Sequence, residues 1–113
     1  MNRNDWGRRQ SPRCWVCELS FKRSTTGSQT HEIARGPFKQ AAMLEPAAWI
    51  QVCQYHHSQM GPPEWPIVKQ LALKKLKNPE HYDRRKVNLL RGRQPEAITE
   101  AEVDAELLKL KGE

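Results

Sequence analysis

Four residues have the types and the spacing of a zinc site. Cys14 and Cys17 form a C-x-x-C pair, and Cys53 and His56 form a C-x-x-H pair after 35 intervening residues. A structural zinc ion takes four thiolate or imidazole ligands in a tetrahedron, commonly as two close pairs from separate turns. The sequence therefore predicts a structural zinc ion bound by Cys14, Cys17, Cys53 and His56. The x-x spacing favours His56 over the adjacent His57 as the fourth ligand.

A C-x-x-C pair also occurs in redox proteins, and cysteines can simply be buried as free thiols. No βαβ pattern surrounds this pair, which argues against the thioredoxin-like alternative. The cysteine count of three is odd, and the polar residues 2–5 that follow Met1 do not form a secretory leader. We therefore expect an intracellular, reducing, cytoplasmic location.

A second cluster contains the residues that zinc would leave over. With His56 on zinc, His57 projects from another side of the same helical turn, while His31 and Glu32 lie on a predicted strand. Two imidazoles and a carboxylate can hold a second divalent cation and activate water, as phosphodiester hydrolysis requires. The same side chains can equally satisfy hydrogen bonds or cap the helix. The residue types alone do not separate these two interpretations.

Residue composition and helix-breaking residues indicate the elements that must position these residues. Residues 30–33 and 49–52 have strand composition, residues 40–44 fit a helical turn, and a short helix around His57 must end by residues 61–63. The chain is therefore predicted to be α+β, with a small zinc-stapled ββα core. Trp15, Trp49 and Trp65 are expected to pack beside the zinc.

Beyond this core the sequence predicts a helical extension. One helix runs from Pro66 to about residue 78, and a second basic helix covers residues 79–90 and is closed by Gly92. Thr99 and Glu102 form a capping box for a last, acidic helix that we expect to dock on its own domain. The predicted organisation is a flexible basic arm at 1–12, the zinc-binding domain at 13–62 and the helical extension at 63–113.

The bulk composition is consistent with a small protein that needs a staple. Of 113 residues, 37% are hydrophobic, and the mean hydropathy is -0.85. A core of this size gains little from apolar burial alone, so metal binding would help to close the free-energy gap. No stretch approaches the roughly 18 uncharged apolar residues of a membrane span, so no membrane partner is expected.

The net charge of +6 is unevenly distributed. Residues 66–93 hold nine basic and two acidic side chains, whereas residues 94–113 hold two basic and six acidic ones. Such a basic stretch favours a polyanion, and with the histidine cluster it favours DNA, although it could also be a solvated helical face. The predicted phosphate contacts are Lys69, Lys74, Lys75, Arg84, Arg85 and Lys86, with Arg35 and Lys39 near the scissile phosphate.

These motifs together resemble the HNH endonucleases of the ββα-metal fold, particularly small phage or prophage-like members. The matching pieces are C-x-x-C at Cys14, the strand with His31 and Glu32 followed by Arg35, and the strand 49–52 leading to Cys53. They cover about residues 12–60. The stretch 65–103 also looks like the tail of such proteins.

The resemblance implies a Mg²⁺-dependent or similar endonuclease in which His57 binds the catalytic cation. Two registers of the strand are open. In the first, His31 binds the cation and Glu32 is the general base. In the second, His31 is the base and Thr30 occupies the metal position. Glutamate is a weaker base than imidazole unless burial raises its pKa.

The sequence departs from the family at one further position. The family's middle Asn, which orients the base, is replaced by Ala48, although Gln40, Gln51 or Gln54 could substitute for it. We predict an HNH-type endonuclease that hydrolyses DNA phosphodiesters with a divalent metal. The alternative is a catalytically weak or inactive zinc-containing module for DNA binding or packaging. A monomer is slightly favoured.

Overall fold

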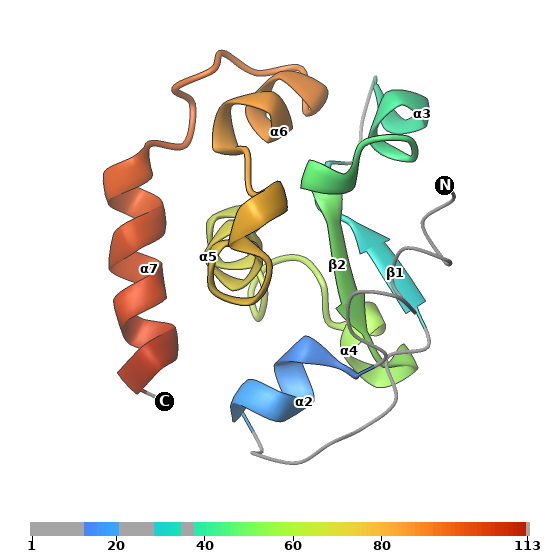
Figure 1. The fold of residues 1–113 in the computed structure, drawn as a ribbon, viewed down its shortest axis with the longest axis vertical. Helices are drawn as coiled ribbons and strands as arrows, with labels where there is room; N and C mark the ends of the chain where they lie inside the picture. The colour runs from blue at the N-terminus through green and yellow to red at the C-terminus, as the bar shows by residue number, and fades with distance from the viewer. Residues whose placement is uncertain (1–12, 21–28, 35–37, 113) are drawn as a thin grey trace.

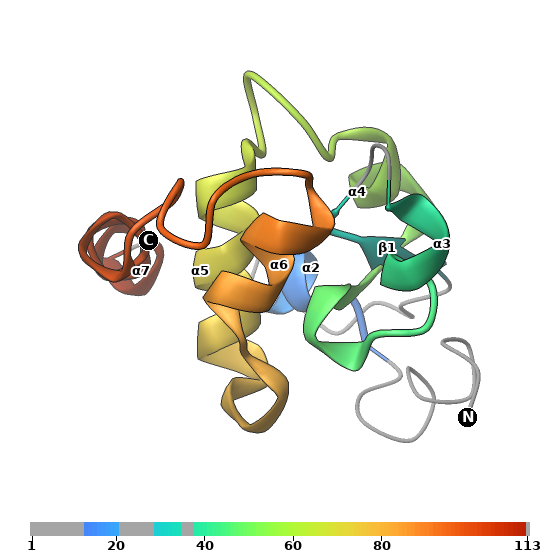
Figure 2. The ribbon, with the colours of Figure 1, turned by 90° about the horizontal axis from the view of Figure 1, so that it is seen from above.

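A two-stranded sheet and the helices around it make up the fold. The computed structural model describes residues 13–20, 29–34 and 38–112 (Figures 1 and 2). The elements, in chain order, are α2 (Trp15–Ser20), β1 (Gln29–Glu32), α3 (Lys39–Ala42), η1 (Pro46–Ala48), β2 (Trp49–Val52), α4 (Gln54–Ser58), α5 (Ile67–Lys77), η2 (Pro79–His81), α6 (Arg84–Leu90) and α7 (Glu100–Gly112). The predicted α+β class is confirmed.

The sheet places the predicted strand residues opposite each other. Strands β1 and β2 are antiparallel, with His31 opposite Ile50 and Glu32 opposite Trp49. Successive side chains on a strand alternate between the two faces, so this register gives His31 and its neighbours different surroundings. All four residues of β2 are buried, as expected for a strand covered on both sides.

Helix α5 is the central element that joins the sheet to the C-terminal part. It lies between α7 and β2 (Figure 1), and Leu71, Ala72 and Leu73 in it are fully buried. Pro66 precedes its first turn and Pro79 follows its end at Asn78, where proline cannot continue a helix. The predicted limits of this helix are confirmed.

The C-terminal region differs in one respect from the expectation. Residues 79–90 form the short η2 and then α6, because the Asp83 side chain accepts a hydrogen bond from the Lys86 amide and starts a new helix. Gly92, with a φ of 74°, lies just after α6, as predicted. The capping box also forms, since Thr99 and Glu102 exchange backbone and side-chain hydrogen bonds.

The buried cluster runs through both halves of the chain. It includes Cys14 and Trp15 near the start, Trp49 in β2, and Val103 and Leu110 on α7. The predicted burial of Trp15, Trp49 and Trp65 is confirmed, at 2%, 1% and 5% exposure. The domain boundary at residues 62–63 stays a prediction, and core packing connects the two sides of it.

Candidate metal centre

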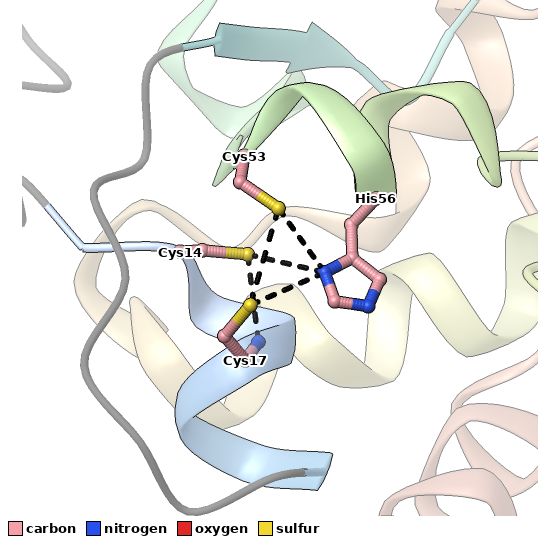
Figure 3. Close-up of side chains that lie close together, drawn as sticks. All are labelled: Cys14, Cys17, Cys53 and His56. Atoms are coloured by element: carbon pink, nitrogen blue, oxygen red, sulfur yellow. Dashed lines mark hydrogen bonds between the residues drawn. The ribbon is translucent and has the colours of Figure 1, made fainter.

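The four predicted zinc ligands come together at the junction of α2 and α4. Cys14 directly precedes α2 and Cys17 lies in its first turn, whereas Cys53 is the N-cap of α4 and His56 lies one turn later (Figure 3). Each pair thus straddles a helix start, where C-x-x-C and C-x-x-H spacing turns both side chains the same way. All four ligand atoms lie within 4.8 Å of one another.

The distances fit a tetrahedral ion. Nδ1 of His56 lies 3.6 Å, 3.4 Å and 3.3 Å from the sulfurs of Cys14, Cys17 and Cys53, and the sulfurs of Cys17 and Cys53 are 3.9 Å apart. Metal bonds of about 2.3 Å to sulfur and about 2.0–2.1 Å to nitrogen give tetrahedral edges of about 3.6–3.8 Å. The residues therefore form a possible metal-binding site that is compatible with structural zinc.

The ionisation of the thiols depends on whether a positive charge lies close to them. Burial raises the pKa of the Cys14 thiol to about 12. Burial also disfavours the Cys53 thiolate, but hydrogen bonds from the His56 backbone and from the neighbouring thiols lower the pKa of Cys53 overall. A buried thiolate needs a nearby positive charge, and a divalent cation in the centre of the four ligands would supply it.

The second predicted cluster lies beside the first. The rings of His31, on β1, and His57, on α4, are edge to face with their centroids 5.3 Å apart. His31 is 2% exposed, while His57 is half-buried, so the pair is more accessible from the α4 side. The candidate metal ligand His56 immediately precedes His57, so a metal ion bound by His56 would fix the helix turn that presents His57.

The neighbours of His31 on β1 are also buried. Thr30 donates a hydrogen bond to Oε1 of Gln51 at 2.8 Å, and Glu32 lies at the end of the strand. The roles predicted for His31, Glu32 and His57 stay predictions. Ala48, at the position of the family's Asn, is fully buried, and its carbonyl accepts the Ile33 amide at 2.7 Å.

Gln70 is a partner of His31 that the sequence analysis did not single out. Its Oε1 lies 2.9 Å from Nε2 of His31, and its Nε2 donates to the carbonyl of Trp65 at 2.7 Å. Gln70 is 1% exposed. A signal for it exists in the sequence, because Gln70 occupies a core-facing position of α5 between Ile67 and Lys74, at helical spacing.

Two of the predicted DNA contacts are wrong. Lys74 is fully buried, and its ammonium donates to the carbonyls of Pro46 and Trp49 and to Asn78. Burial lowers the pKa of Lys74 to about 7, although nearby carboxylates act in the other direction. This lysine ties α5 to the start of β2 and cannot reach a phosphate.

Arg84 is the second incorrect contact. Its side chain is 7% exposed, pairs with Glu96 at 2.9 Å, and donates to the carbonyls of Pro95 and Ile98. The Glu96 carboxylate raises the pKa of Arg84, even though desolvation opposes this. The guanidinium thus holds the segment before α7 in place, and its donors are used within the protein.

The other predicted cations are less constrained. Lys75 bonds to Glu100 at 2.8 Å and to Asp104 at 2.7 Å, which offsets its charge. Arg85 and Lys86 are 70% and 50% exposed and pair only at the surface. Lys69 stacks over Trp65 and lines a pocket of about 310 Å³ together with His56. Arg35 and the side chain of Lys39 lie outside the described residues.

Within residues 13–20, 29–34 and 38–112, the four-residue candidate metal centre and the adjacent pair of His31 and His57 are the groupings on which a function can be argued. Among the helices in the described part of the chain, none has the length and apolar character needed to cross a membrane. Comparison of the chain with protein-family models, curated proteins and solved structures finds no match.

Proposed function

We propose that this protein is a metal-dependent endonuclease of the HNH type, in which zinc holds the fold and a separate cluster acts on the phosphodiester. The observation that carries the proposal is the adjacency of the His31 and His57 rings, at 5.3 Å, beside the Cys₃His centre. Two imidazoles from different elements, one of them next to a zinc ligand, are arranged to share a cation.

In this proposal His31 and His57 hold the divalent cation, and Glu32 is the general base. The first of the two strand registers is preferred, because the Thr30 hydroxyl is engaged with Gln51. When bound, the cation supplies electrostatic stabilisation of the charge that develops on the phosphate. Imidazole ligands suit the later transition metals, so Ni²⁺ should support activity better than Mg²⁺.

The reaction is a hydrolysis in which water is the only reactant besides the phosphodiester. The oxygen of a water molecule attacks phosphorus while Glu32 accepts one of its protons. The bond between phosphorus and the leaving oxygen breaks, and that oxygen takes a proton from the solvent. Glu32 then returns its proton to water.

Nucleic acid is the proposed partner, through the cations that remain accessible. Lys69 lines the pocket beside His56, and Arg85 and Lys86 form only surface ion pairs, which phosphates could replace. Phosphate contacts of this kind carry no sequence information and weaken steeply with salt.

The test is nicking of supercoiled plasmid by the zinc-loaded protein with Mg²⁺, Mn²⁺ or Ni²⁺. The variants His57→Ala, His31→Ala and Glu32→Gln should each lose at least about 100-fold in rate. His81→Ala, a histidine on η2, is the matched control and should retain activity. Absence of metal-dependent nicking, or equal nicking by His57→Ala, would exclude the endonuclease.

A second candidate is a DNA-binding or packaging module that has the fold without the chemistry. Ala48 favours it, because this fully buried position has no side-chain amide that could orient a base. A salt-titrated gel shift separates the candidates together with the nicking assay. DNA binding that weakens with salt, without nicking under any metal, supports the module. Lys69→Ala should weaken that binding more than Lys75→Ala does.

A further inference from the structure

The amide of Gln70 is held in one orientation by its surroundings. Its two polar atoms meet Nε2 of His31 at 2.9 Å and the carbonyl oxygen of Trp65 at 2.7 Å. A carbonyl oxygen only accepts hydrogen bonds, so the NH₂ of Gln70 must face Trp65 and its oxygen must face His31. The reverse orientation would place two acceptors against each other.

This orientation determines where the proton of neutral His31 resides. The Gln70 oxygen needs a donor, and the atom of His31 that faces it, at 2.9 Å, is Nε2. Neutral imidazole carries one N–H, so Nε2 is protonated and Nδ1 carries the lone pair. A lone pair at Nδ1 is what binding of a cation to this ring requires.

The hydrogen bonds of Gln70 also connect the two sides of the site that carry the histidine pair. The Trp65 carbonyl that holds Gln70 also accepts the Gly61 amide at 2.9 Å, and the Trp65 amide donates back to Gly61 at 2.8 Å. Residues 61–65 follow α4, which carries His57, whereas His31 is on β1. One glutamine on α5 therefore ties the α4 side of the site to the β1 side.

We infer that Gln70 is a positioning residue that fixes His31 as the Nε2–H tautomer and presents Nδ1 of that ring to a divalent cation shared with His57. The inference rests on the proposed function for its second half only, since the tautomer is a property of the protein without the cation. Gln70 thus supplies, from a different element, a side-chain amide of the kind that Ala48 lacks. Metal-ligating histidines commonly donate their other N–H in this way, and loss of such a partner typically lowers metal affinity about 10–100-fold.

The experiment measures the tautomer directly. The ¹⁵N and ¹H shifts of the His31 ring are recorded at a mildly alkaline pH in zinc-loaded protein that contains no second metal, with His31→Gln used to assign the signals. The expected result is an Nε2–H ring in the wild type, and a shift toward the Nδ1–H form or a mixture in Gln70→Met. Gln70→Glu, whose carboxyl in its protonated form still accepts from His31 and donates to the Trp65 carbonyl, should restore the Nε2–H form.

Cation affinity provides the second measurement. Ni²⁺ or Mn²⁺ binding to the zinc-loaded protein should weaken about 10–100-fold in Gln70→Met and much less in Gln70→Glu. Zinc content and thermal unfolding identify a variant that fails to fold, in which case Gln70→Glu carries the test. Gln94→Met, at an exposed glutamine after α6, is the matched control.

The outcomes separate this inference from the proposed function. An Nδ1–H ring in the wild type, or an unchanged tautomer and cation affinity in Gln70→Met, would overturn the inference. If the tautomer and the affinity depend on Gln70 but no metal supports nicking, the positioning role stands and the endonuclease does not.

Discussion

Two long-range connections link distant parts of this small chain, and they differ in how well the sequence predicts them. The candidate metal centre brings α2 and α4 together through four residues whose ligand atoms lie within 4.8 Å of one another. The second connection consists of ion pairs that join α5 and α6 to the start of α7 through Arg84, Lys75 and their carboxylate partners. Ligand spacing carries geometric information, whereas charge counts do not. The basic stretch therefore resembled a DNA surface although part of its charge is neutralised inside the fold.

The largest effect is expected at the metal centre. Cys14→Ser, or a strong chelator, should remove zinc and unfold the protein, because apparent zinc-binding free energies of about 10–16 kcal/mol match or exceed the stability of a typical domain. Elemental analysis and circular dichroism would check this, with Gln54→Ala on α4 as the control. A zinc-free protein with unchanged thermal unfolding would contradict the structural role of the metal.

The second largest effect is expected when Arg84, in the second connection, is substituted. Arg84→Met removes two charged hydrogen bonds to the carbonyls of Pro95 and Ile98, which keep the Asn88 amide as a donor, and should lower the free energy of unfolding by about 1.5–3 kcal/mol in urea denaturation. The neighbour Arg85, which is 70% exposed, is the matched control, and Arg85→Met should change stability by less than about 0.5 kcal/mol. Equal effects of the two substitutions would mean that the internal bonds contribute nothing specific.

A pH effect should distinguish Lys74 from an ordinary surface lysine. Its folded-state pKa, lowered to about 7, lies below the value of 10.5 that applies in the unfolded chain. The unfolded state then binds more protons between these values, so stability rises with pH in this window. From about pH 7 to about pH 9 the wild type should gain about 1–3 kcal/mol relative to Lys74→Met.

The comparison for this pH effect uses Lys109→Met, because Lys109 is 70% exposed. Urea denaturation of zinc-loaded protein at the two pH values should give no comparable change for that variant. Parallel stability curves for the wild type and Lys74→Met would show that the Lys74 ammonium persists in the core across this range.

The smallest effect on stability is expected at Lys75, whose ion pairs form the exposed part of the second connection. Lys75→Ala should lower the free energy of unfolding by no more than about 1 kcal/mol, because its partners Glu100 and Asp104 are half exposed. The loss should shrink further at about 1 M NaCl, since salt screens surface pairs. A larger, salt-independent loss would mean that the Lys75 ion pairs contribute to stability as the buried Arg84 contacts do.

The parts of the structure that local chemistry determines were predictable. The limits of β2 and α5, the Thr99 capping box and the convergence of the four candidate zinc ligands follow from strand composition, proline positions and ligand spacing. The C-x-x-C pair was expected to come from a turn, and instead α2 begins directly at Trp15. Burial of that tryptophan against the core favours the helix, and a spacing pattern does not contain this information.

The errors share one physical origin, which is polar residues in the core. Gln70 and Lys74 lie on the inner side of α5, at the spacing that an apolar stripe would use. Gln70 meets the distant His31, and Lys74 satisfies backbone carbonyls of a distant segment, those of Pro46 and Trp49. Such long-range partners depend on the tertiary fold, so a sequence shows only that the position is unusual. Arg84 was misassigned for the same reason.

The burial of Trp15 and Trp49 has an optical consequence. Trp15 follows the candidate metal ligand Cys14 in the sequence and is 2% exposed, and Trp49 is 1% exposed and donates its indole N–H to the carbonyl of Ala42. Indoles in such dry surroundings fluoresce at shorter wavelengths than indoles in water. The chain therefore carries its own emission reporter, with one fluorophore beside the metal centre and another opposite Glu32 on the sheet, and no added dye is needed to follow the release of zinc.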